Sequence, residues 1–557
     1  MWKKVWNVLA EPAVVWRKAV DCRSSLDGLV TAGCRSGTGS HGGAYLLLPS
    51  SKHSGADGSG AARVNPGFTI ISVLVLYLII LLVIGFWGRR ESTSVAGYYV
   101  AGKKLPGWVI AFSSNATGES AWLLLGLTGV GYMVGIHALW IVLGEILGVA
   151  LAWVLVARPF KEYTDRYDSI TVADYLEARF RDSQHLLRLL SVGIIFTMVI
   201  AYTAAQLTAS GKAFSSFLGT TYITGVFIGA GVILFYTTVG GFKAVAYSDL
   251  LQGILMFLGL LILPVVGVAA AGGWTSLMSQ LQSVDPSLLL PMGKFGLSVP
   301  GVVSALGFAS IGFAFLGVPQ ILVRFISARD QGAIITGSLL SVICMVVFET
   351  GAVFSGMAGR VLFPGLEDPE TILPTMGAGL FPAFFTGIFL VIVLAAIMST
   401  ADSLLLLASS AVVRDVVQKI FYPDLSEEHL SFYGKLTTVV IGAGALVFAL
   451  AEVRVIFWFV LFAWSGLASA FTPVVFCSLY WKRTTRAGAV AGMVGGFLTS
   501  MIWVLFFKEW SYDLYEMIPG FLVGFGLTVG VSLFTEAPEG AAQEFDEVHR
   551  ALRTTDH

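Results

Sequence analysis

Leu394-Ala395-Ala396-Ile397-Met398-Ser399-Thr400-Ala401-Asp402-Ser403 places polar side chains inside an apolar run that extends from Phe381 to Val413. A run of that length can form a membrane-spanning helix. At 3.6 residues per turn, Ala396, Ser399, Thr400 and Ser403 lie on one face of this helix. Their oxygen atoms suit a hard cation, although serine and threonine in membranes also commonly hydrogen-bond to a neighbouring helix. The carboxylate of Asp402 in the same segment favours a functional site.

The composition of the whole chain predicts a membrane protein. Of the 557 residues, 56% are hydrophobic and 12% are charged, whereas a soluble domain carries about 25% charged residues. The apolar runs are continuous rather than alternating, so they predict helices and not a barrel. We therefore expect an all-α polytopic membrane protein with about 13 transmembrane helices. The predicted spans are 68–88, 107–134, 138–157, 186–212, 222–239, 246–271, 299–321, 330–362, 382–413, 432–451, 455–480, 488–507 and 516–534, with room for a short helix in 272–298.

The two ends of the chain differ from this transmembrane region, which we place at 67–535. Residues 1–66 are rich in glycine and serine and are expected to be disordered or to follow from a misassigned start. Residues 536–557 are expected to form a charged tail. Lysine and arginine gather in the connections after odd-numbered spans, for example Arg324 and Arg329 after the seventh. The positive-inside rule then places the N-terminus outside and the C-terminus in the cytoplasm.

A second polar stretch, Ser113 to Trp122, lies in the span 107–134 and contains Gly118. Small residues permit local unwinding, and unwound backbone frees carbonyl groups that can coordinate a cation in a cavity. Trp122 offers an aromatic wall for a small organic ligand. The alternative is a kinked helix with a packed tryptophan.

Five carboxylates fall within or near the predicted spans, and each costs about 2.5–3.5 kcal/mol at the membrane centre unless it is paired, protonated or hydrated. No lysine or arginine is expected at a depth that would pair all of them. Asp249 follows a glycine turn and is equally consistent with a helix N-terminal residue and with an ion ligand. Glu145 and Glu349 are expected to make satisfied hydrogen bonds between helices. The five are Glu119, Glu145, Asp249, Glu349 and Asp402.

Enzyme chemistry and nucleic-acid binding find little support in the sequence. The seven histidines are scattered and form no HExxH pattern, and no P-loop occurs. The four cysteines have no metal-ligand spacing. There is no basic stripe for nucleic acid, and no feature indicates an obligate protein partner. We therefore expect a protein that is not an enzyme and whose partners are ions, small solutes and the lipid bilayer.

Several segments, taken in their order and spacing, resemble the sodium/solute symporter family, and most closely its bacterial sodium/proline symporters. The resemblance covers about 68–535. The segments are Ser120 to Leu124 with Gly126, Gly240 to Val245 with Asp249 and Gln252, Gly317 to Phe325, Ala395 to Ser403 with Arg414 and Asp415, Ala463 to Gly466 with Pro473, and Tyr480 to Gly488.

The resemblance implies a leucine-transporter-like core of two inverted five-helix repeats, at about 107–271 and 299–480. It implies a multi-pass protein of the cell (inner) membrane that imports a small organic solute together with Na⁺. Proline or a related amino acid is the leading solute. A sugar, sialic acid or a monocarboxylate, or coupling to protons, are alternatives within transport, and a transporter-fold sensor is a distant one.

The resemblance also implies site residues. Sodium would be held by the carbonyls of Ala116, Glu119 and Ala396 and the hydroxyls of Ser399 and Thr400. A second sodium site would use Asp249, Asp402 and Ser403. The solute would contact Ser120, Ala121, Trp122, Tyr202, Phe315, Pro319 and Ser403. Pro319 and Arg324 both match a segment of the seventh span that is implicated in the proline symporters.

The sequence departs from the proline symporters at the implied solute pocket. Gly118 stands where they carry an aspartate, Ile311 where they carry a tryptophan and Phe315 where they carry a tyrosine.

Overall fold

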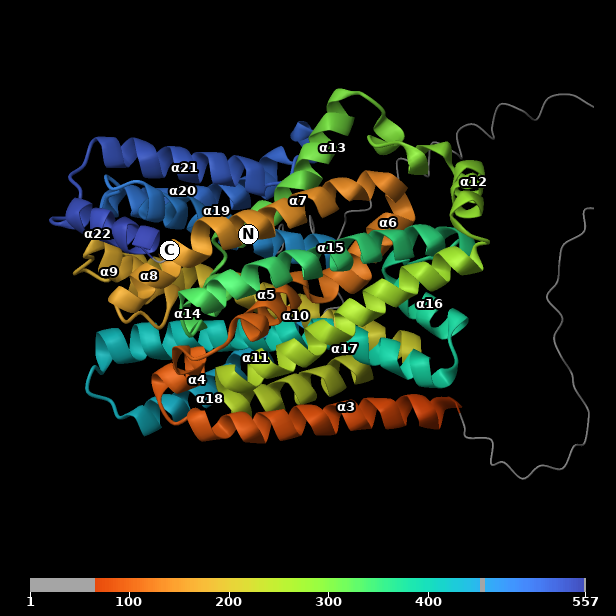
Figure 1. Ribbon diagram of the computed structural model, residues 1–557, viewed down its shortest axis with the longest axis horizontal. Coiled ribbons are helices and arrows are strands. Elements are labelled where there is room, and N and C mark those ends of the chain that lie inside the picture. The colour runs from red at the N-terminus through yellow and green to blue at the C-terminus, as the bar shows by residue number, and fades with distance from the viewer. Residues whose placement is uncertain (1–65, 451–455, 555–557) are drawn as a thin grey trace, which may run out of the picture.

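The computed structural model describes residues 66–450 and 456–554, and in these ranges the regular structure is helical. Figure 1 shows the long helices running side by side along a common axis. The helices that form the bundle are α3 (Pro66–Gly88), α5 (Gly107–Ala121), α6 (Thr128–Val134), α7 (Leu139–Leu151), α10 (Leu186–Leu218), α11 (Tyr222–Ala270), α13 (Val299–Ser310), α14 (Pro319–Ser327), α15 (Gln331–Leu362), α17 (Ala383–Ser410), α18 (Glu427–Ala449), α19 (Ile456–Tyr480), α20 (Arg486–Ile502) and α21 (Met517–Leu533). The remaining helices are α4 (Val95–Val100), α8 (Arg158–Arg166), α9 (Val172–Phe180), α12 (Trp274–Val284), α16 (Ile372–Leu380) and α22 (Ala541–Thr554).

Within the described residues, 10 helical segments are long and apolar enough to cross a membrane, and α21 is a shorter apolar helix. Two of the 10, at 60 and 49 residues, exceed the ~20 residues of one crossing. Gly135 (φ 59°) lies between α6 and α7 in the first, and Gly241 (φ 62°) lies inside α11 in the second. The predicted spans 222–239 and 246–271 thus meet at Gly241. The count of 13 spans stays a prediction.

The interruption predicted within Ser113 to Trp122 is present and falls at Ser120. Ser120 has φ 56° and ψ −168°, so the helical hydrogen-bond ladder of α5 ends there. A wider helical turn over Trp122–Leu127 then leads into α6.

The predicted span 299–321 falls within the candidate span Val299–Ser327, but its helix is interrupted. The chain leaves α13 through a tight turn at Ile311–Leu316, and α14 begins at Pro319. Proline has no N–H to donate and disfavours the helical conformation in the residue before it. Val318 accordingly adopts φ −67° and ψ 131°. Two interrupted helices, α5–α6 and α13–α14, therefore cross the molecule.

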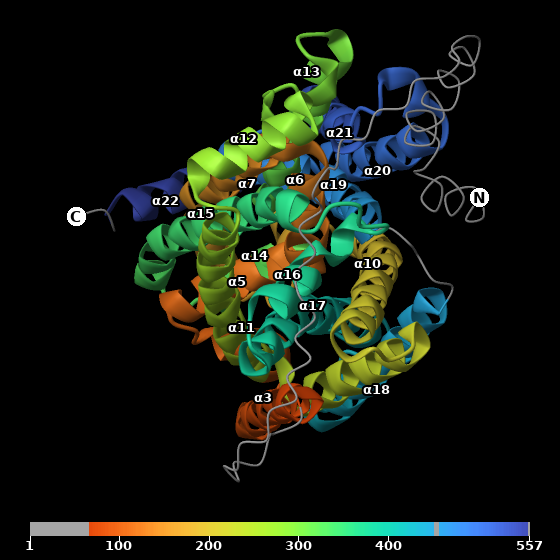
Figure 2. The same ribbon diagram turned by 90° about the vertical axis from the view of Figure 1, so that its right-hand side faces the viewer.

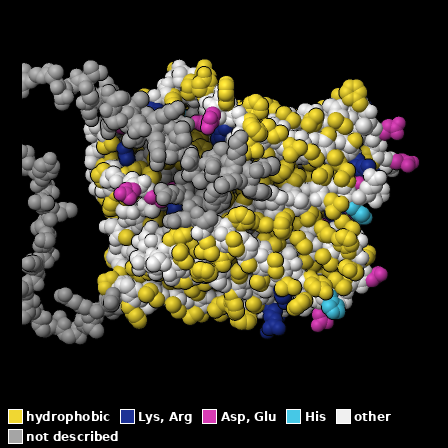
Figure 3. Space-filling view, turned by 180° about the vertical axis from the view of Figure 1, so that it is seen from behind, with side chains coloured by type: hydrophobic (Ala, Val, Ile, Leu, Met, Phe, Trp, Pro, Cys, Tyr) yellow, Lys and Arg dark blue, Asp and Glu magenta, His cyan; other side chains and the backbone are white. Residues whose placement is uncertain are grey.

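The buried fraction of each span distinguishes interior helices from those on the outside of the bundle. The most apolar stretch of α19 is 94% buried and that of α17 is 78% buried, whereas that of α3 is 17% buried. Figure 2 looks along the helices and shows α17 inside the bundle and α3 on its edge. Hydrophobic side chains form large patches on the described part of the face in Figure 3, and the charged groups visible there are few. A surface of this kind is suited to hydrocarbon, as expected for a polytopic membrane protein.

The segments outside the bundle differ in part from expectation. The tail predicted at 536–557 contains α22, which packs on α8 through ion pairs from Arg166 to Glu547 (2.5 Å) and Glu544 (3.5 Å). The 272–298 connection holds α12, as the sequence allowed. The prediction for residues 1–66 lies outside the described residues, apart from Pro66.

Candidate functional site

The polar face of α17 lies against α5 just before its break. The hydroxyl of Ser399 lies 2.9 Å from the carbonyl oxygen of Ala116 and 3.1 Å from that of Ala396. The hydroxyl of Thr400 donates to the carbonyl of Thr117 at 2.8 Å. All of these residues are fully buried. The structure thus brings together four of the five oxygen donors predicted for the first sodium site and adds the carbonyl of Thr117.

The fifth predicted donor, the carbonyl of Glu119, accepts the N–H of Trp122 across the break. The side chain of Glu119 interacts with Glu349 on α15. Glu119 therefore lies beside the cluster formed by Ser399 and Thr400 but makes different contacts.

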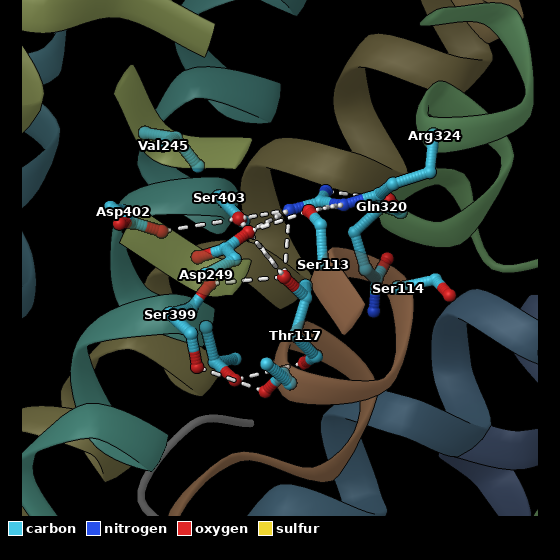
Figure 4. A network of polar contacts seen from close by, with 12 residues as sticks. Ser113, Ser114, Thr117, Val245, Asp249, Gln320, Arg324, Ser399, Asp402 and Ser403 are labelled. Atoms are coloured by element: carbon cyan, nitrogen blue, oxygen red, sulfur yellow. Dashed lines mark hydrogen bonds and ion pairs between the residues drawn. The ribbon is translucent and has the colours of Figure 1, made fainter. Parts of the chain in front are cut away.

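The residues predicted for a second sodium site surround a guanidinium group. Figure 4 shows Arg324 of α14 reaching between α5, α11 and α17. Its Nη2 atom donates to Thr117 Oγ1 (2.7 Å), to Asp249 Oδ2 (3.1 Å) and to the hydroxyl of Ser403. Its Nε atom donates to Ser113 Oγ at 3.2 Å.

This network corrects two expectations. Arg324 is expected in a loop, yet 1% of its surface is exposed. Asp249 lies eight positions after the break of α11 at Gly241 and is fully buried, so it is beyond the first helical turn, where the dipole acts. The pairing of Arg324 with Asp249 is compatible with the expectation that no basic residue pairs all five carboxylates.

Asp402 closes the other side of the network. It accepts hydrogen bonds from the hydroxyl of Tyr236 and from Ser403 Oγ (3.1 Å). Ser403 can therefore accept from Arg324 and donate to Asp402. Thr117 Oγ1 lies 3.1 Å from the carbonyl of Ser399 and 3.2 Å from Ser403 Oγ, so it joins the two polar clusters.

Aromatic side chains enclose the other side of the α5 break. Trp122 stacks on Phe457, with ring centroids 5.8 Å apart. Trp464 packs edge-on against Phe315 (5.2 Å) and Tyr202 (6.5 Å). Two of the remaining residues predicted to contact the solute lie at the break: Ser120 interacts with Tyr202, and Ala121 donates its N–H to Gln206 Oε1 at 3.1 Å. The other two lie elsewhere, since Pro319 begins α14 and Ser403 binds Arg324.

Two buried donors at this break have no acceptor among the described residues, namely Trp122 Nε1 and Gln206 Nε2. Buried polar groups are paired in most native structures, so an unpaired donor calls for an explanation. Together with the backbone freed at the break, these donors suit an anionic group of a small ligand.

A third cluster consists of acids. Glu119 interacts with Glu349 of α15 and with Glu145 of α7, and the exposed fraction of each is 2% or less. Both carboxyl oxygens of Glu119 and of Glu349, and Oε2 of Glu145, have no hydrogen-bond partner among the described residues. The carboxyl–carboxyl contact of Glu119 with Glu349 joins α5 to α15, as expected for Glu349, whereas Oε2 of Glu145 does not meet the expectation of a satisfied hydrogen bond.

Sequence reasoning missed several residues of these clusters. Ser113 and Thr117 share the polar face of α5 at a spacing of four residues, which was a usable signal. Arg324 matches the same family segment as Pro319, but its position at the end of an apolar run reads equally well as a loop, so its contacts could not be predicted. Tyr236 and Trp464 lie in apolar helices where aromatic residues are common. In the structure Tyr236 donates to Asp402, and Trp464 packs against Phe315 and Tyr202.

Comparisons with known proteins identify the family of the chain. Residues 98–496 match the Sodium:solute symporter family. The high-affinity proline transporter PutP of Bacillus subtilis (strain 168) is 36% identical over 469 residues, which cover 83% of this chain and 98% of that protein. The sodium/proline symporter of Staphylococcus aureus (strain JH9) is 33% identical over 498 residues, which cover 87% and 96%.

The fold has a solved counterpart. The structure of a Na⁺-coupled sialic acid symporter in a substrate-bound, outward-open state matches with a TM-score of 0.73 at 19% identity, and covers 85% of this chain and 100% of that chain. That likeness concerns the fold alone, and it confirms the expected all-α, leucine-transporter-like architecture. Since the family match covers most of the chain and the relatives exceed 30% identity over nearly their full length, the chain belongs to the sodium:solute symporter family.

Proposed function

We propose that this chain is a secondary active symporter that imports a small organic solute with sodium, and that proline is the first solute to test. The contact between α5 and α17 carries the proposal. Ser399 and Thr400 meet the carbonyls of Ala116 and Thr117 within 2.9 Å in the buried core. Hydroxyl and carbonyl oxygens are ligands that a hard cation prefers.

The pocket proposed for the solute lies on the other side of the same break. A zwitterionic amino acid has a carboxylate that could accept from Trp122 Nε1 and Gln206 Nε2, which lack acceptors among the described residues. Its apolar ring or chain could pack on the faces of Trp464, Phe315 and Tyr202. The named activities of the bacterial relatives support proline over other amino acids.

The proposed mechanism uses the two interrupted helices. Sodium held between α5 and α17 would stabilise the state open to the outside, and the solute would then bind beside it. Coupling requires that sodium bind the two states with different affinity. An inside-negative membrane potential adds about 2.3 kcal/mol per 100 mV to the driving force for each positive charge that enters the cell.

A proteoliposome uptake screen tests this function. An inward sodium gradient is imposed, and labelled proline, other amino acids, sugars, sialic acid and monocarboxylates are offered separately. We expect accumulation of proline that collapses when choline replaces sodium. Accumulation of a different solute would change the substrate, and no sodium-dependent accumulation of any solute would refute the proposal.

The acidic cluster supports a second candidate, a carrier coupled to protons. The carboxyl groups of Glu119 and Glu349 contact each other in the core and have no basic partner among the described residues, and two buried carboxyls in contact favour sharing a proton. Uptake driven by a pH gradient without sodium, and lost in Glu349→Gln, would favour this candidate.

A further inference from the structure

The C-terminal helix α22 lies across one end of the bundle, on the side that the positive-inside rule assigns to the cytoplasm. Figure 1 shows α22 beside α8 and α9 at that end. Arg166 of α8 pairs with Glu547 of α22 at 2.5 Å and with Glu544 at 3.5 Å. The ring centroids of His549 and of Tyr480, the last residue of α19, lie 6.2 Å apart. The helix therefore contacts both α8 and the end of α19.

The docked side of α22 is apolar. Ala541, Val548 and Leu552 recur at helical spacing, which places them on one side of the helix, and the first two are 1% exposed. The carbonyl of Leu552 accepts a hydrogen bond from Arg158 Nη2 of α8 at 3.3 Å. Apolar burial and charge thus act together to hold α22 on α8.

The two helices under α22 contact the inner ends of helices that carry the candidate site. We call residues 158–180, which comprise α8, α9 and their connection, the α8–α9 arm. Lys161 of this arm donates to the carbonyl of Ile326 near the end of α14 at 3.4 Å. Thr171 donates to Asp415, which lies in the continuation of α17, at 2.7 Å. A contact that holds the arm in place therefore also restrains the inner ends of α14 and α17.

A buried charge of the arm has its nearest described opposite charge on α22 in the same aromatic cluster. Arg179 is fully buried, and its Nη1 and Nη2 atoms have no hydrogen-bond partner among the described residues. Its Nε atom donates to the carbonyl of Ser478 on α19 at 3.2 Å. Tyr163 and Tyr167 interact both with Arg179 and with the carboxylate of Glu544. A buried charge is costly without an opposite charge nearby, so α22 lowers the cost of keeping Arg179 between the arm and α19.

The charged contacts of α22 are weak enough to break reversibly. The side chains of Arg166 and Glu547 are 42% and 38% exposed, and Arg181, which lies 3.8 Å from Glu544, is 46% exposed. Exposed ion pairs contribute little to stability. Salt weakens them further, because the Debye length falls from about 10 Å at 0.1 M to about 3 Å at 1 M ionic strength. High ionic strength should therefore loosen α22 before it disturbs the buried contacts of the bundle.

We propose that α22 is an autoinhibitory helix, which slows the opening of the transport site to the cytoplasm while it is docked on the α8–α9 arm. Rising ionic strength in the cytoplasm releases α22 and speeds transport. The inference rests on the proposed transport function, because alternating access moves one group of helices against another around a fixed site. The arm joins α14 and α17 at the inner end of that site.

The test measures proline uptake in proteoliposomes that hold the full-length chain with its C-terminus inside, under an inward sodium gradient. The lumen contains KCl at about 50 mM or about 500 mM, with sorbitol to equalise the osmolality. We expect the initial rate of the unmodified chain to rise about 3-fold at the higher salt concentration. Glu544→Gln with Glu547→Gln removes both acids that pair with Arg166 and should give the faster rate at either concentration. Asp546→Asn is the matched control, since Asp546 is exposed and makes no ion pair among the described residues, and should follow the unmodified chain.

Two further measurements keep the test decisive if the double variant does not fold. Arg166→Gln leaves Glu544 beside Arg179 and should also transport faster at the lower salt concentration. Hydrogen exchange of the backbone amides of 541–554 in the purified full-length chain reports the release of α22 directly. We expect this exchange to be faster at about 500 mM than at about 50 mM KCl, because local opening exposes these amides.

The outcomes separate this inference from the proposed function. Charge variants that transport no faster than the unmodified chain at the lower salt concentration, or that keep its full response to salt, overturn the autoinhibitory role. Exchange of 541–554 that does not change with salt overturns the release by ionic strength. Absence of sodium-dependent uptake in every variant refutes the proposed function, and with it the inhibition, even where hydrogen exchange shows that salt releases α22.

Discussion

Thr117 connects the two polar clusters at the level of a single residue. Its carbonyl accepts the hydroxyl of Thr400 at 2.8 Å, and its hydroxyl lies 2.7 Å from Arg324 Nη2 and 3.1 Å from the carbonyl of Ser399. A β-branched side chain has few rotamers in a helix, so the backbone and the hydroxyl of Thr117 move together. An ion bound at Ser399 and Thr400 would therefore be sensed by Arg324 through Thr117.

Replacing Ser399 and Thr400 together by alanine should remove sodium dependence. The two hydroxyls are among the donors proposed for the ion, and their loss should raise the sodium concentration for half-maximal uptake at least ~10-fold, or ~1.4 kcal/mol. Initial rates of proline uptake against sodium concentration measure this. Ser409→Ala is the control, since this buried hydroxyl of α17 donates to the carbonyl of Gly434 at 2.8 Å instead. Full sodium stimulation in the double variant would contradict the site.

Replacing Trp122 by alanine should weaken the solute more than sodium. The indole stacks on Phe457 and has an unpaired N–H beside the break. Loss of the aromatic wall and of one donor should raise the dissociation constant for proline by roughly 10-fold while the sodium constant stays within about 2-fold. Trp122→Phe keeps a ring against Phe457, so its dissociation constant for proline should lie between those of the parent and of Trp122→Ala. Equal losses for proline and sodium, measured by binding to purified protein, would remove Trp122 from the pocket.

The two interrupted helices show what the sequence could reveal at the level of elements. The α5 break was predicted because serine, asparagine, glycine and glutamate interrupt an apolar run there. The break before α14 was not, because Ile311–Leu316 is apolar throughout and hydropathy carries no signal for backbone direction. Pro319 was the local cue. Pro319 fixes the start of α14, and the side chain of Arg324 on this helix then points into the core.

Close helix packing supports the second interrupted helix. A Cβ atom on Gly148 of α7 would lie 1.9 Å from the carbonyl oxygen of Gly312, and one on Gly144 would lie 2.1 Å from that of Ala309. These are backbone atoms and cannot move aside singly. The stretch Val299–Leu316 is therefore held against α7 by contact of main chain with main chain.

Gly148→Ala should lower the apparent melting temperature of the detergent-solubilised protein, since overpacking costs about 1–3 kcal/mol. Gly231→Ala in α11 is the matched control, because no heavy atom lies within 4 Å of its added methyl. That control should be neutral or stabilising, as alanine favours helix over glycine by about 1 kcal/mol. Equal melting temperatures for both variants would show that the α7 contact is dispensable.

At the scale of the whole molecule, composition and hydropathy predicted the class of fold and most helix positions. They did not reveal which polar groups meet. The sequence placed Arg324 in a loop, because the depth and the partner of a side chain depend on contacts between helices far apart in sequence. The pairing of Asp249 with Arg324 joins residues 75 positions apart. Such contacts follow from the meeting of α5, α11 and α17 around the side chain of Arg324, which no local pattern encodes.

Ion pairs connect several helices at one end of the bundle. Asp174 of α9 lies 2.9 Å from Arg188 Nη2 and 3.4 Å from Arg414 Nε. Burial alone would raise the pKa of Asp174, but the guanidinium groups of Arg414 and Arg188 outweigh it and hold that pKa below its usual value of 3.8. The folded state therefore keeps this carboxylate ionised at a pH where the unfolded chain takes up a proton.

Acid should weaken the ion pairs of Asp174 with Arg188 and Arg414, because the pKa of Asp174 is lower in the folded than in the unfolded chain. The stabilisation is fully present above about pH 4 to 5 and is lost as the pH falls through the lowered pKa of folded Asp174. Asp174→Asn should lower the apparent melting temperature at pH 6 and show less further loss between about pH 5 and pH 3 than the parent. Asp168→Asn, whose side chain is 97% exposed, should follow the parent. Parallel acid profiles for parent and Asp174→Asn would contradict this account.

The central claim is that solute and sodium cross together, and reciprocal coupling tests it most directly. Proteoliposomes with equal sodium on both sides and no membrane potential receive an inward proline gradient, and entry of ²²Na⁺ is followed. The account predicts transient accumulation of ²²Na⁺ inside, dependent on proline and absent in the Ser399→Ala, Thr400→Ala double variant. Proline entry without any accompanying ²²Na⁺ accumulation would contradict it.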